Sequence, residues 1–249
     1  MARQRALGVI PARYGATRFP GKPLAMIQGK PMVQHVYERA LKAKSLARVI
    51  IATDDQRIAA AVKGFGGEAV MTPSALPSGT HRVAAVARDV SCDVIVNIQG
   101  DEPLIEPAMI DEIANALLDD PQAPMATLCR RLEAPEEIAN PNIVKVARDR
   151  QGFALYFSRA PIPFRRGTTA AYWKHLGIYG YQKAALLQFI ALPPTPLEQA
   201  EQLEQLRALE HGLRIKALET AHDTVAVDTP EDLKKVEERL SARSLQPMP

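Results

Sequence analysis

The sequence predicts an α/β protein with a mostly parallel sheet and helices on both faces, and three observations lead to this prediction. Short apolar runs, such as residues 48–52 and 93–98, have the length and the Val and Ile content of strands that are buried on both faces. Segments with apolar residues at helical spacing separate these runs, as in a chain of alternating strands and helices. The 249 residues, of which 47% are hydrophobic, suffice for one large domain or two modest ones.

Strands and helices are expected to alternate in the first part of the chain, with one long loop after the first strand. In chain order, the strand, loop, helix, strand, helix and strand cover residues 7–10, 12–23, 31–44, 48–52, 56–64 and 68–71. Pro31 stands at the preferred start of its helix, and the glycines after the second helix end it. Asp54, in the turn before that helix, either caps it or touches a nucleotide from the end of its strand.

The pattern changes near residue 124, beyond which several short strands follow one another. Before that point, a helix at 81–90, a strand at 93–98 and a helix at 107–118 are expected. The later segments are strands at 125–132, 143–147, 152–156, 172–181 and 214–219, a helical turn at 135–140, and helices at 195–211 and from 230 onward. The chain therefore reads as one domain over 1–249, with an inserted antiparallel part at about 125–212 and a return to the main sheet at 213–243.

The spacing of the leucines in the expected helix at 195–211 predicts which residues face the core. The inner face of this helix is expected to carry Leu197, Ala200, Leu203, Leu206 and Leu209. Most of the acidic residues of the same segment are expected on its solvated face.

Composition and charge exclude several classes of protein. The net charge of +3 comes from Lys and Arg residues that are scattered along the chain, so the sequence does not predict nucleic-acid binding. The sequence has no run of about 18 apolar residues, so we expect a cytoplasmic protein without a membrane segment. Cys92 and Cys129 stand apart from each other in apolar surroundings, which favours reduced thiols over a metal site.

The loop at 12–23 has the composition of a polyphosphate cradle. It carries Arg13, Arg18 and Lys22, and its glycines allow a ligand to approach the backbone closely. A solvated connection of the same composition is the alternative. The loop contains neither a P-loop, because Pro23 follows Lys22, nor a G-x-G-x-x-G pattern, so any phosphate is bound in another way.

Two further loops precede helices and carry candidate site residues. Ser78, Gly79 and Thr80 supply small side chains and backbone amides that could line a flat base, although an ordinary capped helix start has the same pattern. Asp101 follows the strand at 93–98 and is the best metal-ligand candidate, with Glu102 as the alternative. Because Mg²⁺ takes one or two protein carboxylates, a second one is expected elsewhere, whereas Glu106 more plausibly belongs to the start of its helix.

A cluster of polar residues in the later strands could hold an anionic, hydroxyl-rich ligand. Arg159 matches the fork of a carboxylate, and His175 and Tyr179 can serve hydroxyl groups. A structural role is the alternative for His175, which stands in an aromatic strand. Asp228 comes just before Thr229-Pro230, where either it or Thr229 caps the last helix.

The motif GATRFPGKP, with P-A-R upstream, resembles the phosphate-binding signature of cytidylyltransferases that activate acidic sugars. The resemblance runs from about Val9 to about Leu240, and Y-W-K-H-L-G-I-Y-G-Y, L-E-Q-L-R and D-T-P-E-D-L are similar to the same family. It implies a Rossmann-like nucleotidyltransferase sheet with an inserted smaller antiparallel part for sugar binding and dimerisation. It further implies CTP and 3-deoxy-D-manno-octulosonate (Kdo) as substrates, Mg²⁺ as cofactor, a homodimer, and activation of Kdo for lipopolysaccharide synthesis.

The resemblance also implies roles for single residues. The implied catalytic set is Arg13, Lys22, Asp101 and Asp228, of which the two aspartates hold the metal. Nucleotide binding is assigned to Arg13, Lys22, Ser78, Gly79, Thr80 and Gln99, and sugar binding to Gln99, Arg159, His175, Tyr179, Glu204 and Gln205. The chain departs from the family at His81, where an acidic residue is usual. A cytidylyltransferase for another acidic sugar and a nucleotide-sensing domain without turnover are the alternatives.

Overall fold

The computed structural model describes residues 6–15, 19–167 and 171–244, and the chain divides into two compact units. Unit 1 is built mainly from Cys92–Val96 and Asp111–Asp223. Unit 2 is built from Leu7–Ser91, Asn97–Ile110 and the segment that begins at Thr224. Both β6 (Val94–Asn97) and α4 (Pro107–Asp119) contribute residues to the two units.

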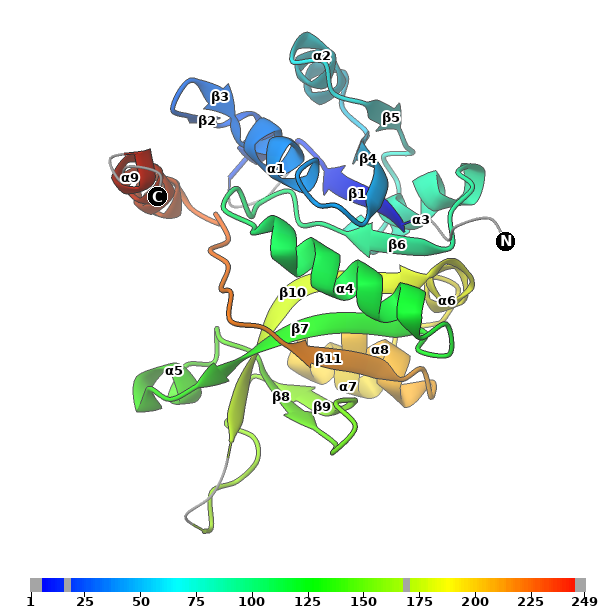
Figure 1. The fold of residues 1–249 in the computed structure, drawn as a ribbon, viewed down its shortest axis with the longest axis vertical. Helices are drawn as coiled ribbons and strands as arrows, with labels where there is room; N and C mark the ends of the chain where they lie inside the picture. Colours follow the sequence, from blue (N-terminus) through cyan, green and yellow to red (C-terminus); the bar gives the residue numbers. More distant parts are fainter. Residues whose placement is uncertain (1–5, 16–18, 168–170, 245–249) are drawn as a thin grey trace. The chain divides into compact units, whose positions relative to one another are not determined.

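Unit 2 contains the strand order β1-β4-β5 with helices between the strands (Figure 1). Its elements are β1 (Ala6–Ala12), α1 (Met32–Ala40), β4 (Leu46–Thr53), α2 (Gln56–Gly64), β5 (Ala69–Met71) and α3 (Gly79–Asp89). β4 and β5 are parallel, with Ile51 opposite Ala69, and nearly all residues of β1 are buried. β1 and the last five residues of β4 therefore behave as the apolar runs predict, because a strand covered by helices on both faces buries successive side chains on either side.

The remainder of unit 2 is a small cluster around the last helix. The elements here are the 3-10 helix η1 (Lys22–Leu24), the antiparallel pair β2 (Met26–Ile27) and β3 (Lys30–Pro31), and α9 (Pro230–Ser244). Val236 of α9 packs with Ile27, Met32, Leu104 and Val227 in one buried apolar cluster. This cluster fixes the segment just before α9 to the rest of unit 2.

Unit 1 contains a mixed set of strands. Its strands are β7 (Met125–Leu132), β8 (Lys145–Arg148), β9 (Ala154–Ser158), β10 (Tyr172–Gln182) and β11 (Ile215–Glu219). β10 runs antiparallel to β7, β11 runs parallel to β7 on its other side, and β8 and β9 form an antiparallel pair. Together with unit 2 these pairings confirm the predicted α/β class.

The helices of unit 1 are short apart from α4. They are α5 (Pro135–Ala139), α6 (Lys183–Phe189), α7 (Pro196–Glu201) and α8 (Gln205–Glu210). α4 packs closely on β10, because a Cβ added at Gly180 would lie 2.3 Å from an Ile113 side-chain atom. The sequence analysis did not predict α6, and it placed the start of α3 two residues late.

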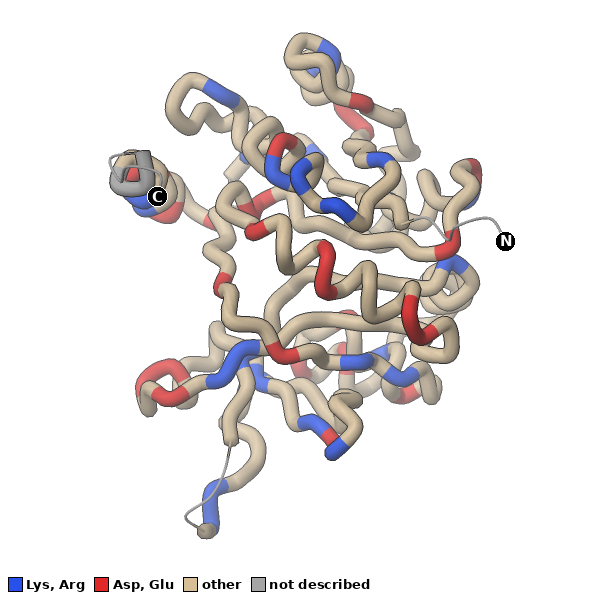
Figure 2. The backbone as a smooth tube through the Cα atoms, viewed as in Figure 1, with Lys and Arg blue, Asp and Glu red and all other residues tan. Residues whose placement is uncertain are grey.

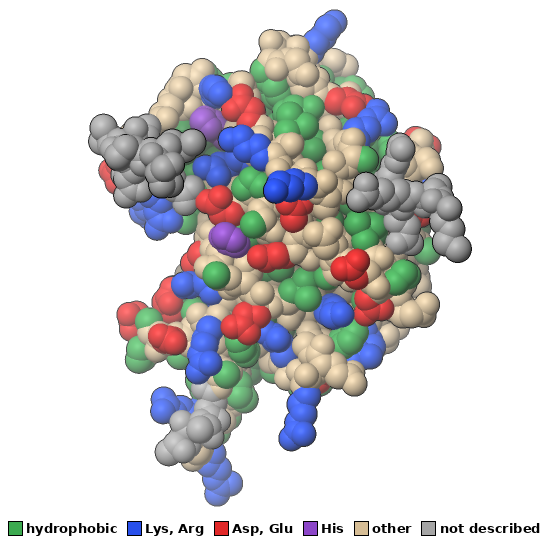
Figure 3. All heavy atoms as spheres, viewed as in Figure 1, with side chains coloured by type: hydrophobic (Ala, Val, Ile, Leu, Met, Phe, Trp, Pro, Cys, Tyr) green, Lys and Arg blue, Asp and Glu red, His purple; other side chains and the backbone are tan. Residues whose placement is uncertain are grey.

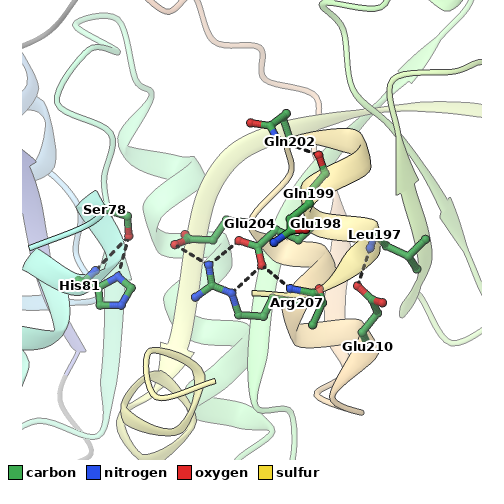
Figure 4. A network of polar contacts seen from close by, with 10 residues as sticks. Ser78, His81, Leu197, Glu198, Gln199, Gln202, Glu204, Arg207 and Glu210 are labelled. Atoms are coloured by element: carbon green, nitrogen blue, oxygen red, sulfur yellow. Dashed lines mark hydrogen bonds and ion pairs between the residues drawn. The ribbon is translucent and has the colours of Figure 1, made fainter. Parts of the chain in front are cut away.

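The prediction of one continuous helix at 195–211 is wrong. Gln202 adopts a left-handed conformation with φ 54°, and the chain forms α7 and α8 on either side of it. Figure 4 shows a contact that a continuous helix could not make: the Arg207 guanidinium reaches back to the Glu198 carboxylate, with Nε 2.8 Å from Oε2. Residues nine positions apart in a continuous helix are separated by about 13.5 Å along its axis, so this ion pair requires a break. Leu197 is exposed as a result, and so is Ala200.

Charges of both signs are distributed along the whole backbone and interspersed on the face drawn in space-filling form (Figures 2 and 3). Within the described ranges, no helix combines the length and the apolar character that a membrane crossing requires.

Candidate active site

A cavity of about 220 Å³ lies in unit 2, where the loops after β1 and β6 meet the start of α3. Its lining residues are Pro11, Ala12, Arg13, Lys22, Pro23, Gly79, Arg82, Gln99, Gly100 and Asp101. Arg13, Lys22, Gly79, Gln99 and Asp101 are five of the predicted site residues. The pocket thus gathers the predicted phosphate loop, the predicted base loop and one predicted metal ligand.

Close backbone contact between two loops builds the floor of this cavity. The N–H of Ile98, just after β6, donates to the carbonyl of Val9 in β1 at 2.9 Å. The loops that follow β1 and β6 therefore start side by side. A Cβ at Gly100 would lie 2.8 Å from the backbone oxygen of Pro11, closer than real Cβ atoms approach. Gly100 therefore permits an approach that no other residue type allows at this position.

The phosphate loop is closed on itself and presents Lys22 to the cavity. Gly21 adopts φ +73° and donates its N–H to the carbonyl of Tyr14 at 2.9 Å, which brings the two ends of the loop together. The Arg57 guanidinium lies 3.3 Å from the centre of the Tyr14 ring and adds a cation–π contact. Arg13 is exposed at the cavity, whereas Arg18 lies outside the described residues.

Lys22 joins the two predicted metal ligands. Its Nζ lies 2.8 Å from Oδ2 of Asp101 and 3.3 Å from Oδ1 of Asp228. The side chain of Lys22 is 15% exposed, against 29% for Asp101 and 55% for Asp228. Two carboxylates from distant parts of the sequence thus share one ammonium group at the edge of the cavity.

Backbone contacts bring Asp228 to this place. The N–H of Val227 donates to the carbonyl of Asp101 at 2.9 Å, and the side chain of Val227 belongs to the buried cluster beneath α9. The Thr229 hydroxyl accepts from the N–H of Asp232, while the Asp232 carboxylate accepts from the N–H groups of Thr229 and Asp228. Thr229 and Asp232 cap α9 in this way, which leaves the carboxylate of Asp228 for the site.

The donor set fits a magnesium ion better than a transition metal. Asp101 and Asp228 offer hard carboxylate oxygens, and Mg²⁺ is usually held by one or two carboxylates together with phosphate oxygens and water. The ammonium of Lys22 stands between them and shows that the pair attracts a cation. Among the described residues no group of three or more His, Cys, Asp and Glu side chains has a metal-binding arrangement, and Glu102 is buried.

The base loop combines the predicted functional and structural features. Ser78 is the N-cap of α3, and its Oγ accepts from the N–H of His81, as Figure 4 shows. Ser78 Oγ also lies 2.9 Å from Nδ1 of His81, so the residue that departs from the family pattern binds the cap. Gly79 lines the cavity and Thr80 is buried within the first turn of α3.

Asp54 does not cap α2, which is one of the two roles that the sequence left open for it. Asp55 is the N-cap of α2 and accepts from the N–H of Arg57, because its side chain stands one residue nearer to the helix. Asp54 instead pairs with Arg82, with 2.8 Å between Nη2 and Oδ2. Arg82 lines the cavity from α3 with only 3% of its side chain exposed, and the sequence analysis missed it. The sequence places Arg82 three residues after Gly79, in the first turn of α3, but no local pattern indicates that it pairs with Asp54.

Arg159 lies in unit 1 just after β9, and both its backbone and its side chain form hydrogen bonds with other residues of unit 1. Its N–H donates to the Glu201 carboxylate at 2.9 Å, and its carbonyl accepts from Nζ of Lys145 at 2.6 Å. Its Nε donates to the backbone carbonyl of Glu201, and its Nη1 to the carbonyl of Pro141. We call Lys145, Arg159 and Glu201 the Lys145 cluster. The sequence analysis found only Arg159 among its members.

His175 and Tyr179 contact each other. A bulge in β10 leaves two residues between Leu176 and Tyr179 without partners on β7, and the bend brings the rings to 5.3 Å between centroids. The Tyr179 hydroxyl lies 2.8 Å from Nε2 of His175, and the Thr127 hydroxyl lies 3.2 Å from the same nitrogen. Burial lowers the pKa of His175 to about 3 and raises the pKa of Tyr179. Both side chains are therefore uncharged at neutral pH.

Glu204 and Gln205 stand at the break between α7 and α8. Glu204 Oε1 lies 3.9 Å from Nη2 of Arg207, at the outer limit of an ion pair (Figure 4). Gln205 is 7% exposed, and its Nε2 is buried without a hydrogen-bond partner in the described structure. A buried amide donor without a partner costs about 1 to 3 kcal/mol, which a ligand acceptor would offset.

Comparison with known proteins gives concordant results. The sequence model of the cytidylyltransferase family matches residues 7–215 of this chain. A 3-deoxy-manno-octulosonate cytidylyltransferase of Geobacter sulfurreducens is 52% identical over 245 residues, which cover 93% of this chain and 98% of that protein. A 3-deoxy-manno-octulosonate cytidylyltransferase of Syntrophobacter fumaroxidans is 55% identical over 238 residues, which cover 93% of this chain and 95% of that protein. A solved CMP:2-keto-3-deoxy-manno-octonic acid synthetase complexed with CTP superimposes with a TM-score of 0.92 at 48% identity, over 97% of this chain and 100% of that one.

The α/β fold and the pocket with Arg13, Lys22 and Arg82 at the ends of its strands agree with the class that the family match gives, the nucleotidyltransferases. Within this class, the chain belongs to the cytidylyltransferase family, among the 3-deoxy-manno-octulosonate cytidylyltransferases.

Proposed function

We propose that this enzyme transfers CMP from CTP to the anomeric hydroxyl of Kdo, giving CMP-Kdo and pyrophosphate and activating Kdo for bacterial lipopolysaccharide synthesis. The names of its relatives and the CTP complex of the similar structure support this proposal. One observation carries it: Asp101 and Asp228 both contact the ammonium of Lys22, and Lys22 lines a pocket together with Arg13. That arrangement suits a polyphosphate and its metal.

The reaction asks the protein mainly for alignment and charge stabilisation. The oxygen of the sugar hydroxyl bonds to the α-phosphorus of CTP and gives up its proton to the solvent. The bond from that phosphorus to the oxygen that bridges it to the β-phosphorus breaks, and pyrophosphate leaves with the electron pair. Arg13 and Lys22 line the pocket as cations and would stabilise the charge that develops on the phosphoryl oxygens and the leaving group. Ser78, Gly79, Thr80 and Gln99 would hold the nucleotide.

Asp101 and Asp228 would hold Mg²⁺ through their carboxylate oxygens. The ion would supply Lewis acidity and lower the pKa of a coordinated hydroxyl, so that the protein needs no strong base of its own. The two aspartates would position the cation toward the phosphates, since both face the cavity edge at Lys22.

For the sugar we propose contacts from Arg159, His175, Tyr179, Glu204 and Gln205 of unit 1, and we propose Gln99 of unit 2 as a further sugar-binding residue. Arg159 would pair with the sugar carboxylate, and its fixed backbone favours a single orientation of the guanidinium. The buried amide of Gln205 supports a role for this residue, because a sugar hydroxyl would provide the acceptor that it lacks in the described structure. Neutral His175 and Tyr179 would donate or accept hydrogen bonds without adding charge.

We further propose a homodimer that works in the cytoplasm. We propose that the second copy covers Leu155 and Leu197 of unit 1, which are 63% and 39% exposed. Cys92 and Cys129 are free thiols, which is the usual state in a reducing compartment. Light scattering on the full chain should give the mass of two copies, and Leu155→Asp should shift it toward one copy. A monomeric wild-type enzyme would contradict the dimer.

The substrate is tested by pyrophosphate release from CTP and Mg²⁺ with a panel of acidic sugars. Kdo should be used, N-acetylneuraminate should be a poor substrate, and the carboxamide of Kdo should be rejected because it cannot pair with Arg159 as an anion. Equal use of Kdo and its carboxamide would remove the proposed carboxylate contact. Preference for another acidic sugar would keep the reaction type and change the substrate.

A further inference from the structure

Lys22 occupies the position between two carboxylates that a divalent cation would need. Its Nζ lies within 2.8 Å of Asp101 and 3.3 Å of Asp228, which are the oxygens assigned above to the metal. Lys30 differs in setting: among the described residues it pairs only with Glu38, and the two side chains are 47% and 40% exposed. The Lys22 pair is partly shielded from water, so its electrostatic energy is screened less than that of the Lys30 pair.

A metal and this ammonium compete for the two carboxylates. One ammonium balances one of the two negative charges, whereas a divalent cation balances both. Both cations in one place would repel each other at a few ångströms. Metal binding at Asp101 and Asp228 is therefore opposed as long as Lys22 stays between them.

The cavity offers Lys22 another anion when nucleotide is bound. Lys22 itself lines the cavity, and its long flexible side chain can turn from the carboxylates toward a polyphosphate. The N–H of Gly21, next to Lys22, donates to the carbonyl of Tyr14, so the side chain can turn without a change in this backbone contact. A polyphosphate thus attracts the ammonium and leaves the two carboxylates available.

We propose that Lys22 is the internal counter-ion of the Asp101–Asp228 pair, and that it blocks divalent metal there until the polyphosphate of a nucleotide draws it away. This inference rests on the proposed function for the identity of the nucleotide. The consequence is an order of events in which polyphosphate and metal bind together while metal alone binds weakly. By linkage, metal must strengthen polyphosphate binding by the same factor.

The blocking role is tested by Mn²⁺ titration of the full chain without nucleotide or sugar, with free Mn²⁺ read by electron paramagnetic resonance. Lys22→Met and Lys22→Gln both remove the charge and should bind Mn²⁺ at least about tenfold more tightly than wild type. Lys22→Arg keeps a cation and should stay weak. Lys30→Met removes a lysine–carboxylate pair elsewhere in unit 2 and should equal wild type.

The location of the gained site is tested by adding Asp228→Asn to Lys22→Gln, which should abolish the gain. Equal Mn²⁺ affinity in wild type and both neutral variants would overturn the proposal, as would an equal gain in Lys30→Met. The assay contains neither CTP nor Kdo, so it can succeed when the substrate assignment fails, and the reverse also holds.

The release by polyphosphate is tested by calorimetric CTP binding in the presence of a chelator. Wild type, Lys22→Met, Asp228→Asn and the double variant form a cycle that separates general repulsion between carboxylate and phosphate from competition for Lys22. Asp228→Asn should improve metal-free CTP affinity severalfold more in wild type than in Lys22→Met. Additive effects would show that Lys22 does not move between the two partners.

Discussion

Two lysines of this chain have lost most of their contact with water, and their partners differ in kind. Lys22 in unit 2 faces the carboxylates of Asp101 and Asp228 at the edge of a cavity. Lys145 in unit 1 is fully buried, and its Nζ donates to the backbone carbonyls of Asn140, Ile143 and Arg159 at 3.0, 2.7 and 2.6 Å. The carboxylates can change one cation for another, whereas the carbonyls belong to loops that need this donor to keep their shape.

The contrast separates an exchangeable site from a fixed support. A buried ammonium is expensive to desolvate, and burial lowers the pKa of Lys145 accordingly. Three carbonyl acceptors compensate for that cost and hold the backbone of Arg159 from one side, while Glu201 holds its N–H from the other. The Lys22 site is built to take a ligand, and the Lys145 cluster is built to keep one side chain in place.

The largest expected effect concerns the exchangeable site. Asp101→Asn and Asp228→Asn should each lower turnover at least about 100-fold, which corresponds to roughly 2.7 kcal/mol of barrier, because each removes a charged metal ligand. Steady-state rates with CTP, Kdo and Mg²⁺ measure this loss, and urea unfolding should show that both variants fold. Near-normal Mg²⁺-dependent turnover in either variant would remove that residue from the site.

Arg159→Ala tests what the fixed support positions. It should weaken apparent Kdo affinity by about 10- to 100-fold, because one hydrogen bond to a charged group is worth roughly 1.5 to 3 kcal/mol. CTP affinity, measured without sugar, should hardly change. The exposed Arg150→Ala is the matched control and should resemble wild type. A loss of CTP affinity as large as the loss of Kdo affinity would place Arg159 outside the sugar site.

Lys145→Met tests the support itself. It removes the donor for three carbonyls but also relieves a desolvated charge, so we expect a net loss of about 2 kcal/mol in unfolding free energy. Urea unfolding measures it, with Lys30→Met as a control that should change by less than about 0.5 kcal/mol. An unchanged stability would mean that water replaces the ammonium, and the contrast between the two lysines would disappear.

The smallest expected effect is a pH dependence in unit 1. The pKa of His175 is lowered from 6.5 to about 3, so between these values the unfolded chain binds a proton that the folded chain does not. Stability should therefore fall by about 1 to 2 kcal/mol between roughly pH 7 and pH 5. Unfolding curves of His175→Gln should lose this part of the slope. A slope equal to that of wild type would show that protonated His175 is tolerated in the fold.

The sequence was informative wherever a local pattern has one physical solution. Apolar runs predicted β1, β4 and β7, and the Thr229-Pro230 start of α9 left Asp228 available, as the capping contacts show. The pocket likewise contains Arg13, Lys22 and Asp101. These features depend on strand ends and helix starts, which neighbouring residues determine.

Long-range contacts were out of reach for the same analysis. In the sequence Lys145 is one more polar residue of a strand. Only the fold brings the carbonyls of Asn140, Ile143 and Arg159 to its Nζ. The break at Gln202 follows from the pair between Arg207 and Glu198, while leucine spacing alone predicted a continuous helix. Asp54 and Asp55 are chemically equal candidates for a cap. Asp55 caps α2 because it stands next to the helix start, and only the fold shows that Asp54 pairs with Arg82.

The most direct test of the account is a crystal structure of the enzyme with CTP and Mn²⁺, with the metal located by its anomalous scattering. The account predicts one metal bonded to carboxylate oxygens of both Asp101 and Asp228 at about 2.0 to 2.2 Å, with Nζ of Lys22 moved onto a phosphate oxygen. A metal held only by phosphates, with Lys22 still between the two aspartates, would contradict it.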